Sequence, residues 1–201
     1  LSELPFDSRP SLSVWLANLL TALIRWRIPL APFFVYDAPM RGTGKTKAAN
    51  GVAILAIGRD APSAGQPEDG AEAEKFWFSM LLAGDAIILL DDVEGAIGGK
   101  LLCRIATSTS MQSRLLGESK SVSVSTAVTV MITANNARYR GDIARRVLTC
   151  RLDAGVEHPE HRTFSRPNLE AFLHENRKDL VCAALTILKA YDAAGRPPVD
   201  L

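Results

Sequence analysis

The chain has 201 residues, of which 47% are hydrophobic and 22% are charged, and its formal net charge is +1. This length and composition predict one sizeable α/β domain, or such a domain with a small appendage. The balanced charge excludes a globally basic nucleic-acid-binding protein, so any contact with nucleic acid must come from a local patch or from several converging subunits.

The sequence carries no signal peptide, and the apolar stretch 12–30 is interrupted by Asn18, Arg25 and Arg27. We therefore expect no membrane span. Because the chain begins at Leu1 and not at Met, we expect a piece of a longer protein.

Three cysteines, Cys103, Cys150 and Cys182, are far apart in the sequence and show no C-x-x-C spacing. They predict buried small hydrophobic side chains, not a zinc site or a set of disulfides. Reduced cysteines are typical of a reducing compartment, so we expect the protein to be cytoplasmic.

The first expected element is an amphipathic helix over 11–27, capped by Ser11 or Ser13. We expect its apolar stripe to pack against the core, in preference to binding a partner. Pro29 and Pro32 end the helix, so residues 1–29 form an N-terminal segment. The stripe consists of Leu12, Trp15, Leu16, Leu19, Leu23 and Trp26.

Residues 33–46, FFVYDAPMRGTGKT, predict a strand, a glycine-containing loop and the first turn of a helix. A phosphate-binding P-loop requires this context. Gly42 and Gly44 allow the backbone amides to approach an anion, and the helix points its positive end at the same place. Lys45 is predicted to reach the β- and γ-phosphates of ATP, and the Thr46 hydroxyl to ligate Mg²⁺. The predicted nucleotide-binding residues are Pro39, Met40, Arg41, Gly42, Thr43, Gly44, Lys45, Thr46 and Lys47.

Pro39 takes the place of the first glycine in the usual pattern G-x-x-x-x-G-K-[ST], and it has no N–H to offer. The later amides, those of residues 42–46, can still cradle phosphate. The alternative is a glycine-rich turn that merely starts a helix. The strand before it and the helix expected over 45–57, which Gly58 ends, argue against that alternative.

Two further strands are predicted to end in polar side chains at the sheet edge where ligands bind. Residues 86–92 end in Asp91 and Asp92, and residues 127–133 are followed by Asn135. Asp91 is the candidate ligand for Mg²⁺, and Asp92 is the candidate for polarising the attacking water. Asn135 is predicted to hydrogen-bond the γ-phosphate or the water, although asparagine is also common in turns.

A last strand, 147–152, directly follows Arg145 and Arg146. This pair is either an ordinary salt-bridging pair or a source of positive charge for a neighbouring subunit's nucleotide site. We expect a short strand near 63–66, helices over 71–83 and 99–107, a hairpin arm at 121–124, a connecting loop over 153–167 and helices over 168–193. The expected division is therefore a core over 30–153 and a linker with a helical lid over 154–201.

The order of these motifs resembles that of AAA+ P-loop ATPases, over about residues 30–195. The likeness is closer to the ATPase/helicase module of phage, plasmid and integrative-element primase–helicase proteins. It rests on the segments DDVEG (91–95), SRLLG (113–117), TANN (133–136), GDIARR (141–146) and AALTIL (183–188). The resemblance implies a three-layer α/β sandwich with a mainly parallel central sheet, followed by a small helical lid.

The resemblance also implies roles for single residues. Lys45 and Thr46 take the Walker A positions, Asp91 and Asp92 the Walker B positions, and Asn135 the sensor-1 position. Arg146 takes the arginine-finger position, with Arg145 as second choice. No residue matches the second sensor arginine expected in the lid.

One departure concerns catalysis, because Asp92 stands where the family usually has glutamate. Its shorter side chain can misplace the carboxylate by more than 1 Å, which can cost roughly 10²-fold in rate. Glu94 is the alternative water-positioning acid. We therefore expect hydrolysis to be slow or complete only in an assembled ring.

The leading hypothesis is a ring-forming, self-assembling ATPase that moves along DNA during replication of a mobile element, with ATP and Mg²⁺ as its cofactors. Lys120 in the hairpin arm is the candidate DNA contact, although an ordinary two-stranded edge explains the arm equally well. The alternative is a nucleotide-dependent switch or loader that remodels a protein partner. A small-molecule kinase is a weaker third hypothesis.

Overall fold

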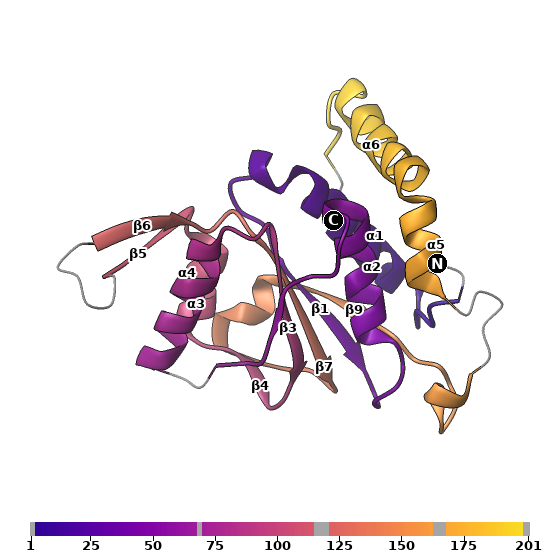
Figure 1. Ribbon diagram of the computed structural model, residues 1–201, viewed down its shortest axis with the longest axis horizontal. Coiled ribbons are helices and arrows are strands. Elements are labelled where there is room, and N and C mark those ends of the chain that lie inside the picture. The colour runs from indigo at the N-terminus through magenta and orange to yellow at the C-terminus, as the bar shows by residue number, and fades with distance from the viewer. Residues whose placement is uncertain (1–2, 68–69, 115–120, 163–167, 199–201) are drawn as a thin grey trace.

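The computed structural model describes residues 3–67, 70–114, 121–162 and 168–198. Its centre is a parallel five-stranded sheet with the order β2-β3-β7-β1-β9 (Figure 1). These strands are β1 (Phe33–Ala38), β2 (Ser63–Ala64), β3 (Ile87–Val93), β7 (Thr129–Asn135) and β9 (Val147–Arg151). Parallel strands with both faces covered need near-continuous apolar sequences, and β1, β3 and β7 have them.

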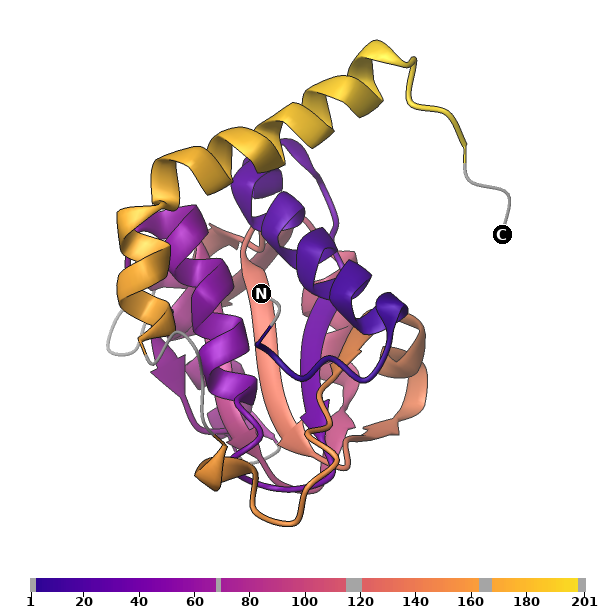
Figure 2. The same ribbon diagram turned by 90° about the vertical axis from the view of Figure 1, so that its right-hand side faces the viewer.

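Helices cover both faces of the sheet, so the molecule has three layers (Figures 1 and 2). Alternate residues of β1 face opposite sides: Phe34 and Tyr36 pack toward α1 and α2, while Phe33 and Val35 pack toward α3. The helices are α1 (Arg9–Ile24), α2 (Lys45–Ile57), α3 (Ala71–Ala83), α4 (Lys100–Thr107), α5 (Leu169–Glu175) and α6 (Arg177–Ala193). The expected three-layer α/β fold is confirmed. No helix in the described ranges is long and apolar enough to cross a membrane.

The predicted N-terminal helix is wrong at both ends. Ser8, not Ser11 or Ser13, caps α1, because Pro10 suits the first turn and the Ser8 side chain accepts the N–H of Ser11. The α-helix ends at Ile24 and a 3₁₀ turn, η1 (Arg25–Arg27), follows.

This change of helix type explains why Trp26 does not belong to the core. A 3₁₀ turn advances by a larger angle per residue than an α-helix, so the apolar stripe loses its phase there. Arg25 is buried in its place, and 76% of Trp26 is exposed. Trp15 and Leu19, earlier on the same stripe, are buried against α2 and the sheet as expected.

Two small sheets flank the main one. The predicted hairpin arm is present: β5 (Ser110–Arg114) and β6 (Ser121–Ser125) pair antiparallel and project from the body (Figure 1). Lys120 lies outside the described residues. Sequence reasoning missed the parallel pair β4 (Ala96–Gly98) and β8 (Arg138–Arg140), which follows the acidic strand. Gly98 is required there, because a Cβ atom would lie 2.3 Å from the Arg140 carbonyl oxygen.

The C-terminal helices pack on the layer formed by α1 and α2 (Figure 2). Arg177, at the start of α6, donates from Nε to the carbonyl oxygens of Ile54 and Leu55 at 2.9 and 3.0 Å. It therefore caps the carboxyl end of α2, where the Ile54 carbonyl also accepts the Gly58 N–H. Short 3₁₀ turns complete the described elements, η2 (Gly141–Arg145) and η3 (Pro159–His161).

The three cysteines differ in burial. Cys150 is buried as predicted, Cys103 is half-buried, and Cys182 is exposed, contrary to the prediction. Cys182 lies on α6, a helix whose only buried residue is Ala184, so most of its side chains meet solvent.

Candidate functional site

The loop between β1 and α2 has the backbone of an anion-binding loop. Gly42 and Gly44 adopt positive φ angles of 77° and 100°, which side chains with a Cβ rarely tolerate. Gly44 is the N-cap of α2, and no side chain caps that helix, so its first N–H groups stay available to an anion. Thr43 closes the loop by donating from Oγ1 to the Met40 carbonyl at 2.8 Å.

Pro39 has no N–H, but its carbonyl oxygen anchors the loop. The Asn136 Nδ2 atom donates to this oxygen at 3.0 Å, and the Asn136 backbone N–H donates to the Ala38 carbonyl at 2.9 Å. The start of the loop is thereby tied to the end of β7. Proline at this position leaves the later amides of the loop free for phosphate.

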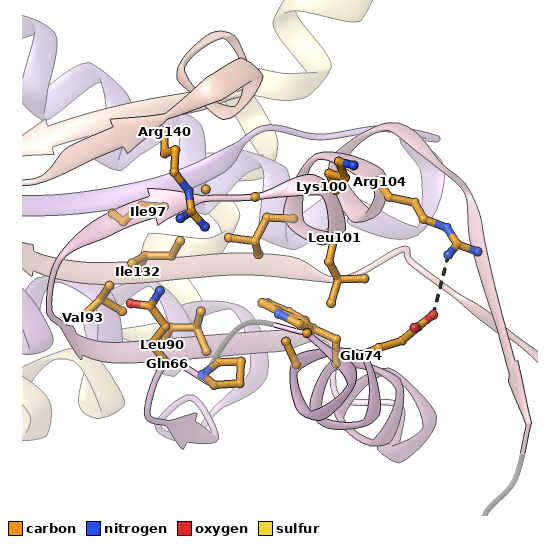
Figure 3. A pocket seen from close by; sticks show the side chains of 17 residues that line it. Gln66, Glu74, Leu90, Val93, Ile97, Lys100, Leu101, Arg104, Ile132 and Arg140 are labelled. Carbon is orange, nitrogen blue, oxygen red and sulfur yellow. Dashed lines mark ion pairs between the residues drawn. The ribbon is translucent and has the colours of Figure 1, made fainter.

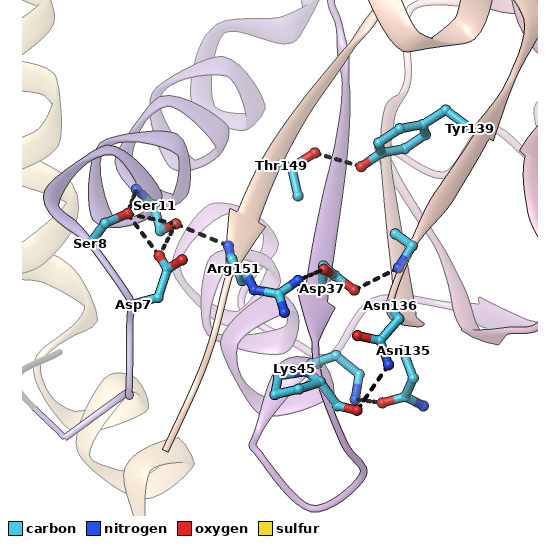
Figure 4. Close-up of polar contacts among 12 residues, drawn as sticks. Asp7, Ser8, Ser11, Asp37, Lys45, Asn135, Asn136, Tyr139, Thr149 and Arg151 are labelled. Carbon is cyan, nitrogen blue, oxygen red and sulfur yellow. Dashed lines mark hydrogen bonds and ion pairs between the residues drawn. The ribbon is translucent and has the colours of Figure 1, made fainter. Parts of the chain in front are cut away.

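Lys45 is the buried cation of the loop, with 7% of its surface exposed. Its Nζ atom donates to Asn135 Oδ1 at 2.8 Å (Figure 4). Burial lowers the pKa of Lys45, while the carboxylates of Asp92, Asp37 and Asp91 oppose that shift. The lysine is thus partly desolvated and positioned toward the strand end that carries the polar side chains.

The two acids of β3 form hydrogen bonds with neighbouring hydroxyl and amide side chains. Asp91 Oδ1 accepts hydrogen bonds from Thr46 Oγ1 at 2.9 Å and from Thr133 Oγ1 at 2.6 Å. The Asp92 N–H donates to Thr133 Oγ1 at 2.7 Å, and Asp92 Oδ1 accepts from Asn135 Nδ2 at 3.3 Å. The five side chains Lys45, Thr46, Asp91, Asp92 and Asn135 therefore meet at one edge of the sheet, as the sequence predicted.

The backbone is irregular where these acids lie. The β3–β7 register shifts between Leu90 and Val93, and Asp92 has a φ of 50°. Bulges redirect side chains, and a left-handed backbone at a residue other than glycine is sparsely populated. The irregularity separates the directions of neighbouring carboxylates, so that Asp91 faces Thr46 and Asp92 faces Asn135.

The oxygen atoms beside the P-loop fit a magnesium ion better than a softer metal. Within the described ranges, no group of three His, Cys, Asp or Glu side chains could hold a metal by itself. Magnesium usually takes one or two protein oxygens and keeps water and substrate phosphates as its other ligands. The Thr46 hydroxyl and the Asp91 carboxylate are such a set.

Arg41 and Glu94 lie at the outer rim of the site. Arg41 Nη2 is 3.4 Å from Glu94 Oε1 and 3.6 Å from Asp92 Oδ2. The side chains of Arg41 and Glu94 are 75% and 84% exposed, so these ion pairs add little stability. Lys47 is also exposed. Of the two candidate acids, Asp92 is the one that contacts Asn135.

Arg145 and Arg146 lie at the opposite edge of the sheet. The Phe33 N–H at the start of β1 donates to the Arg146 carbonyl at 2.9 Å, and Val147 is in register with Phe33. The P-loop follows the other end of β1, so neither arginine reaches its own P-loop. Arg145 is exposed, whereas Arg146 is half-buried and its Nε atom has no acceptor within the described part of the chain.

Sequence reasoning missed an ion pair beneath the P-loop. Asp37, only 4% exposed, pairs with Arg151 at the end of β9 and accepts the Ala137 N–H at 2.8 Å (Figure 4). The Arg151 N–H in turn donates to Ser11 Oγ at 3.0 Å, which links this pair to α1. A carboxylate in an otherwise apolar strand directly before the P-loop was the available signal. Thr133 belongs to the TANN segment, but no pattern in the sequence indicated that its hydroxyl would join Asp91 to Asp92.

A cavity of about 640 Å³ lies elsewhere, between α3, α4 and the far face of β3 and β7 (Figure 3). Trp77, Leu90, Val93, Ile97 and Ile132 form its apolar floor, with Lys100, Arg104 and Glu74 at its rim. None of the P-loop residues lines it. The cavity is therefore distinct from the cluster formed by Lys45, Thr46, Asp91, Asp92 and Asn135.

Comparison with known proteins identifies no family for this chain. No family model matches the sequence. No curated protein sequence matches it either.

Solved structures resemble the fold. The A-form apo structure of the NrS-1 C-terminal region (305–718) matches with a TM-score of 0.53 and 12% identity, over 88% of this chain and 41% of that one. A second structure of that region has a TM-score of 0.44 and 15% identity, over 83% and 43%. The JCV helicase with a bound thiazolopyridine compound has a TM-score of 0.48 and 16% identity, over 83% and 51%.

The chain spans about two fifths of the NrS-1 region. At 12% identity the match concerns the fold, and the two matches with TM-scores under 0.5 are too weak to add to it.

Proposed function

We propose that this chain is an ATP-binding and ATP-hydrolysing motor module of the AAA+ class. The observation that carries the proposal is the convergence of a P-loop lysine and threonine with Asp91, Asp92 and Asn135. These residues come from two parallel strands, β3 and β7, and from the first turn of α2, and they lie at one edge of the sheet. Ligands of open α/β sheets bind at that edge.

Each side chain has a task in hydrolysis. Lys45 binds the β- and γ-phosphate oxygens. Its ammonium group becomes available to them when it releases its hydrogen bond to Asn135 Oδ1. Thr46 and Asp91 would hold Mg²⁺, which neutralises charge that develops on the phosphates. Asp92 orients the attacking water and accepts its proton. Asn135, already hydrogen-bonded to both Lys45 and Asp92, positions that water against the γ-phosphate.

An arginine from a neighbouring subunit completes the site in this proposal. Arg145 and Arg146 lie at the sheet edge opposite their own P-loop, so they serve only a second copy of the chain. The exposure of Arg145 makes it the better placed of the two to reach across an interface. A closed ring would supply one such arginine to every site, and this is the assembly that we propose.

DNA is the proposed track of the motor. The hairpin of β5 and β6 turns Met111 and Val124 inward, while Ser121, Ser123 and Ser125 are exposed. A row of hydroxyl groups suits hydrogen bonds to phosphate oxygens, and Lys120, which precedes Ser121 in the sequence, supplies a positive charge. A cytoplasmic helicase or translocase in mobile-element replication is the setting that the motif resemblance supports.

A nucleotide-dependent switch or loader is the second candidate, and Asp92 favours it. Aspartate at the water-positioning site, held at a strained φ of 50°, fits slow turnover. Steady-state ATP hydrolysis with and without single-stranded DNA separates the two functions. A motor shows turnover that rises with DNA and unwinds a forked duplex. A switch binds ATP with DNA-independent turnover and unwinds nothing.

A further inference from the structure

The segment that joins α1 to β1 exposes an aromatic ring next to a cation. Trp26 is 76% exposed, and the Arg27 guanidinium lies 5.2 Å from the centre of its ring. Arg27 has no acidic partner within the described ranges. The other two tryptophans are each 1% exposed and pack in the core. Core packing therefore does not explain a tryptophan at position 26.

Arg25 ties this segment to the base of the hairpin. Its Nε atom donates to the Val128 carbonyl at 3.0 Å, and its Nη2 atom donates to the Thr126 carbonyl at 3.1 Å. A third donor, Nη1, contacts the Ile28 carbonyl. These bonds satisfy a guanidinium that is only 5% exposed, so the turn is held in place. The end of α1 accordingly lies beside the root of β6 (Figure 1).

From this geometry we infer that Trp26 and Arg27 form a second contact for single-stranded nucleic acid, with a base stacked on the indole and a phosphate on the guanidinium. The inference rests on the proposed function and adds a contact to it. Stacking on exposed aromatic rings and backbone contacts from arginine are the two elements of single-strand binding without sequence preference. Because Arg25 holds this segment beside the hairpin of β5 and β6, one nucleic-acid strand can pass over both the segment and the hairpin.

A protein partner and a second copy of the chain fit this surface less well. An interface core needs several apolar side chains around its anchor. Leu30, 44% exposed, is the other large exposed hydrophobic residue between Leu12 and Met40. A flat ring with a cation beside it and one exposed leucine on the same segment matches a nucleotide better than a protein.

The test is a titration of the 201-residue chain with an oligothymidylate of about 20 nucleotides, followed by tryptophan fluorescence. Because Trp15 and Trp77 are buried, Trp26 is the tryptophan that a base can quench. Trp26→Ala is expected to lower affinity roughly tenfold, and Trp26→Phe to keep most of it, since a phenyl ring still stacks. Arg27→Gln should reduce the slope of log affinity against log salt by about 0.7.

Tyr191→Ala is the matched control, because Tyr191 is an aromatic residue that is 48% exposed, on α6 and not on the segment that joins α1 to β1. It should leave affinity unchanged. Wild-type affinity in Trp26→Ala, or an equal loss in Tyr191→Ala, overturns the inference while the proposed function stands. A wild-type chain that does not bind single-stranded DNA overturns both. A change in solution mass in Trp26→Ala without DNA would assign the ring to a subunit contact and also overturn the inference.

Discussion

Lys45 Nζ donates a hydrogen bond to Asn135 Oδ1 at 2.8 Å, across 90 residues of sequence. The bond joins the start of α2 to the end of β7, and it gives the buried ammonium a partner in the absence of phosphate. Asn135 also donates to Asp92 at 3.3 Å, so one amide links the proposed phosphate-binding cation to the proposed water-positioning acid. In the proposed function, phosphate binding at Lys45 is therefore coupled to the position of Asp92.

The lowered pKa of Lys45 predicts a pH dependence of ATP binding. Burial favours the neutral amine, so Lys45 loses its proton below the ordinary value of 10.5. Affinity for ATP should be constant at lower pH and fall as pH rises through this lowered pKa. The unfolded chain holds its proton to higher pH, so the contribution of Lys45 to the free energy of unfolding increases over the same interval.

Calorimetric titration with ATP and Mg²⁺ at a series of pH values measures this dependence. Lys45→Ala is the control, because it lacks the titrating group and should show no such fall. Equal affinity of the folded wild type across the whole alkaline range would show that Lys45 does not contact phosphate as an ammonium.

Asp92 and Glu94 are predicted to differ in their effect on turnover. Asp92 contacts Asn135, whereas Glu94 is exposed and pairs with Arg41 at the rim. Asp92→Asn should retain ATP binding and lose turnover by about 10²-fold or more, because an amide cannot accept the proton of water. Glu94→Gln should keep most of the activity. Phosphate release and nucleotide binding are measured for both, and the opposite ranking would make Glu94 the water-positioning acid.

Two threonines of β7 form a matched pair for a stability test. Thr133 Oγ1 bridges Asp91 and the Asp92 N–H, whereas Thr129 Oγ1 is buried without a partner in the described structure. Thr133→Val should lower the free energy of unfolding by about 1–3 kcal/mol and raise the Mg²⁺ concentration needed for turnover. Thr129→Val removes an unsatisfied hydroxyl and should be neutral or stabilising.

Urea unfolding of both variants provides the comparison. If Thr133→Val and Thr129→Val have the same stability and the same Mg²⁺ requirement, the hydrogen bonds between Thr133 and the two acids contribute neither to the free energy of unfolding nor to Mg²⁺ binding.

Subunit mixing tests the arginine from a neighbouring copy. Arg145→Ala, Arg146→Ala and Lys45→Ala are each mixed pairwise, and ATP turnover is recorded against protein concentration. An arginine supplied in trans contributes about 10³–10⁵ in rate. We expect turnover to recover when Lys45→Ala is mixed with the variant that lacks the trans-acting arginine. In that mixture, the intact P-loop of the arginine variant meets the intact arginine of Lys45→Ala.

The half-buried Arg146 provides an internal comparison. If Arg146 supports the fold of the η2 turn, Arg146→Ala lowers the melting temperature and Arg145→Ala alone responds to mixing. Turnover that is linear in protein concentration for the wild type, with no rescue in any mixture that co-assembles, would contradict a shared site.

Local patterns in the sequence were sufficient for the sheet and for the centre of the site. Continuous apolar runs identified β1, β3 and β7, and parallel pairing then brings their carboxyl ends to one edge. That is why Lys45, Asp91 and Asn135 meet as predicted. The Gly-Thr-Gly-Lys-Thr spacing placed the start of α2 correctly.

Contacts between distant segments could not be predicted. The hydrogen bonds of Thr133 to the two acids depend on the register of β3 against β7 and on a bulge that no residue type in the sequence indicates. The exposure of Trp26 depends on a 3₁₀ turn that Arg25 stabilises through carbonyls more than 100 positions later in the chain. Helical periodicity alone placed Trp26 in the core.

The most direct measurement is the affinity for ATP and Mg²⁺ of the wild type, Lys45→Ala and Lys47→Ala. Both substitutions remove one positive charge, but Lys45 is 7% exposed beside the strand ends, whereas Lys47 is exposed. The account predicts that Lys45→Ala lowers affinity by at least about tenfold, through loss of the cation on the β- and γ-phosphates, and that Lys47→Ala lowers it less. Unchanged affinity in Lys45→Ala, or equal losses in both variants, would contradict a P-loop nucleotide site in this chain.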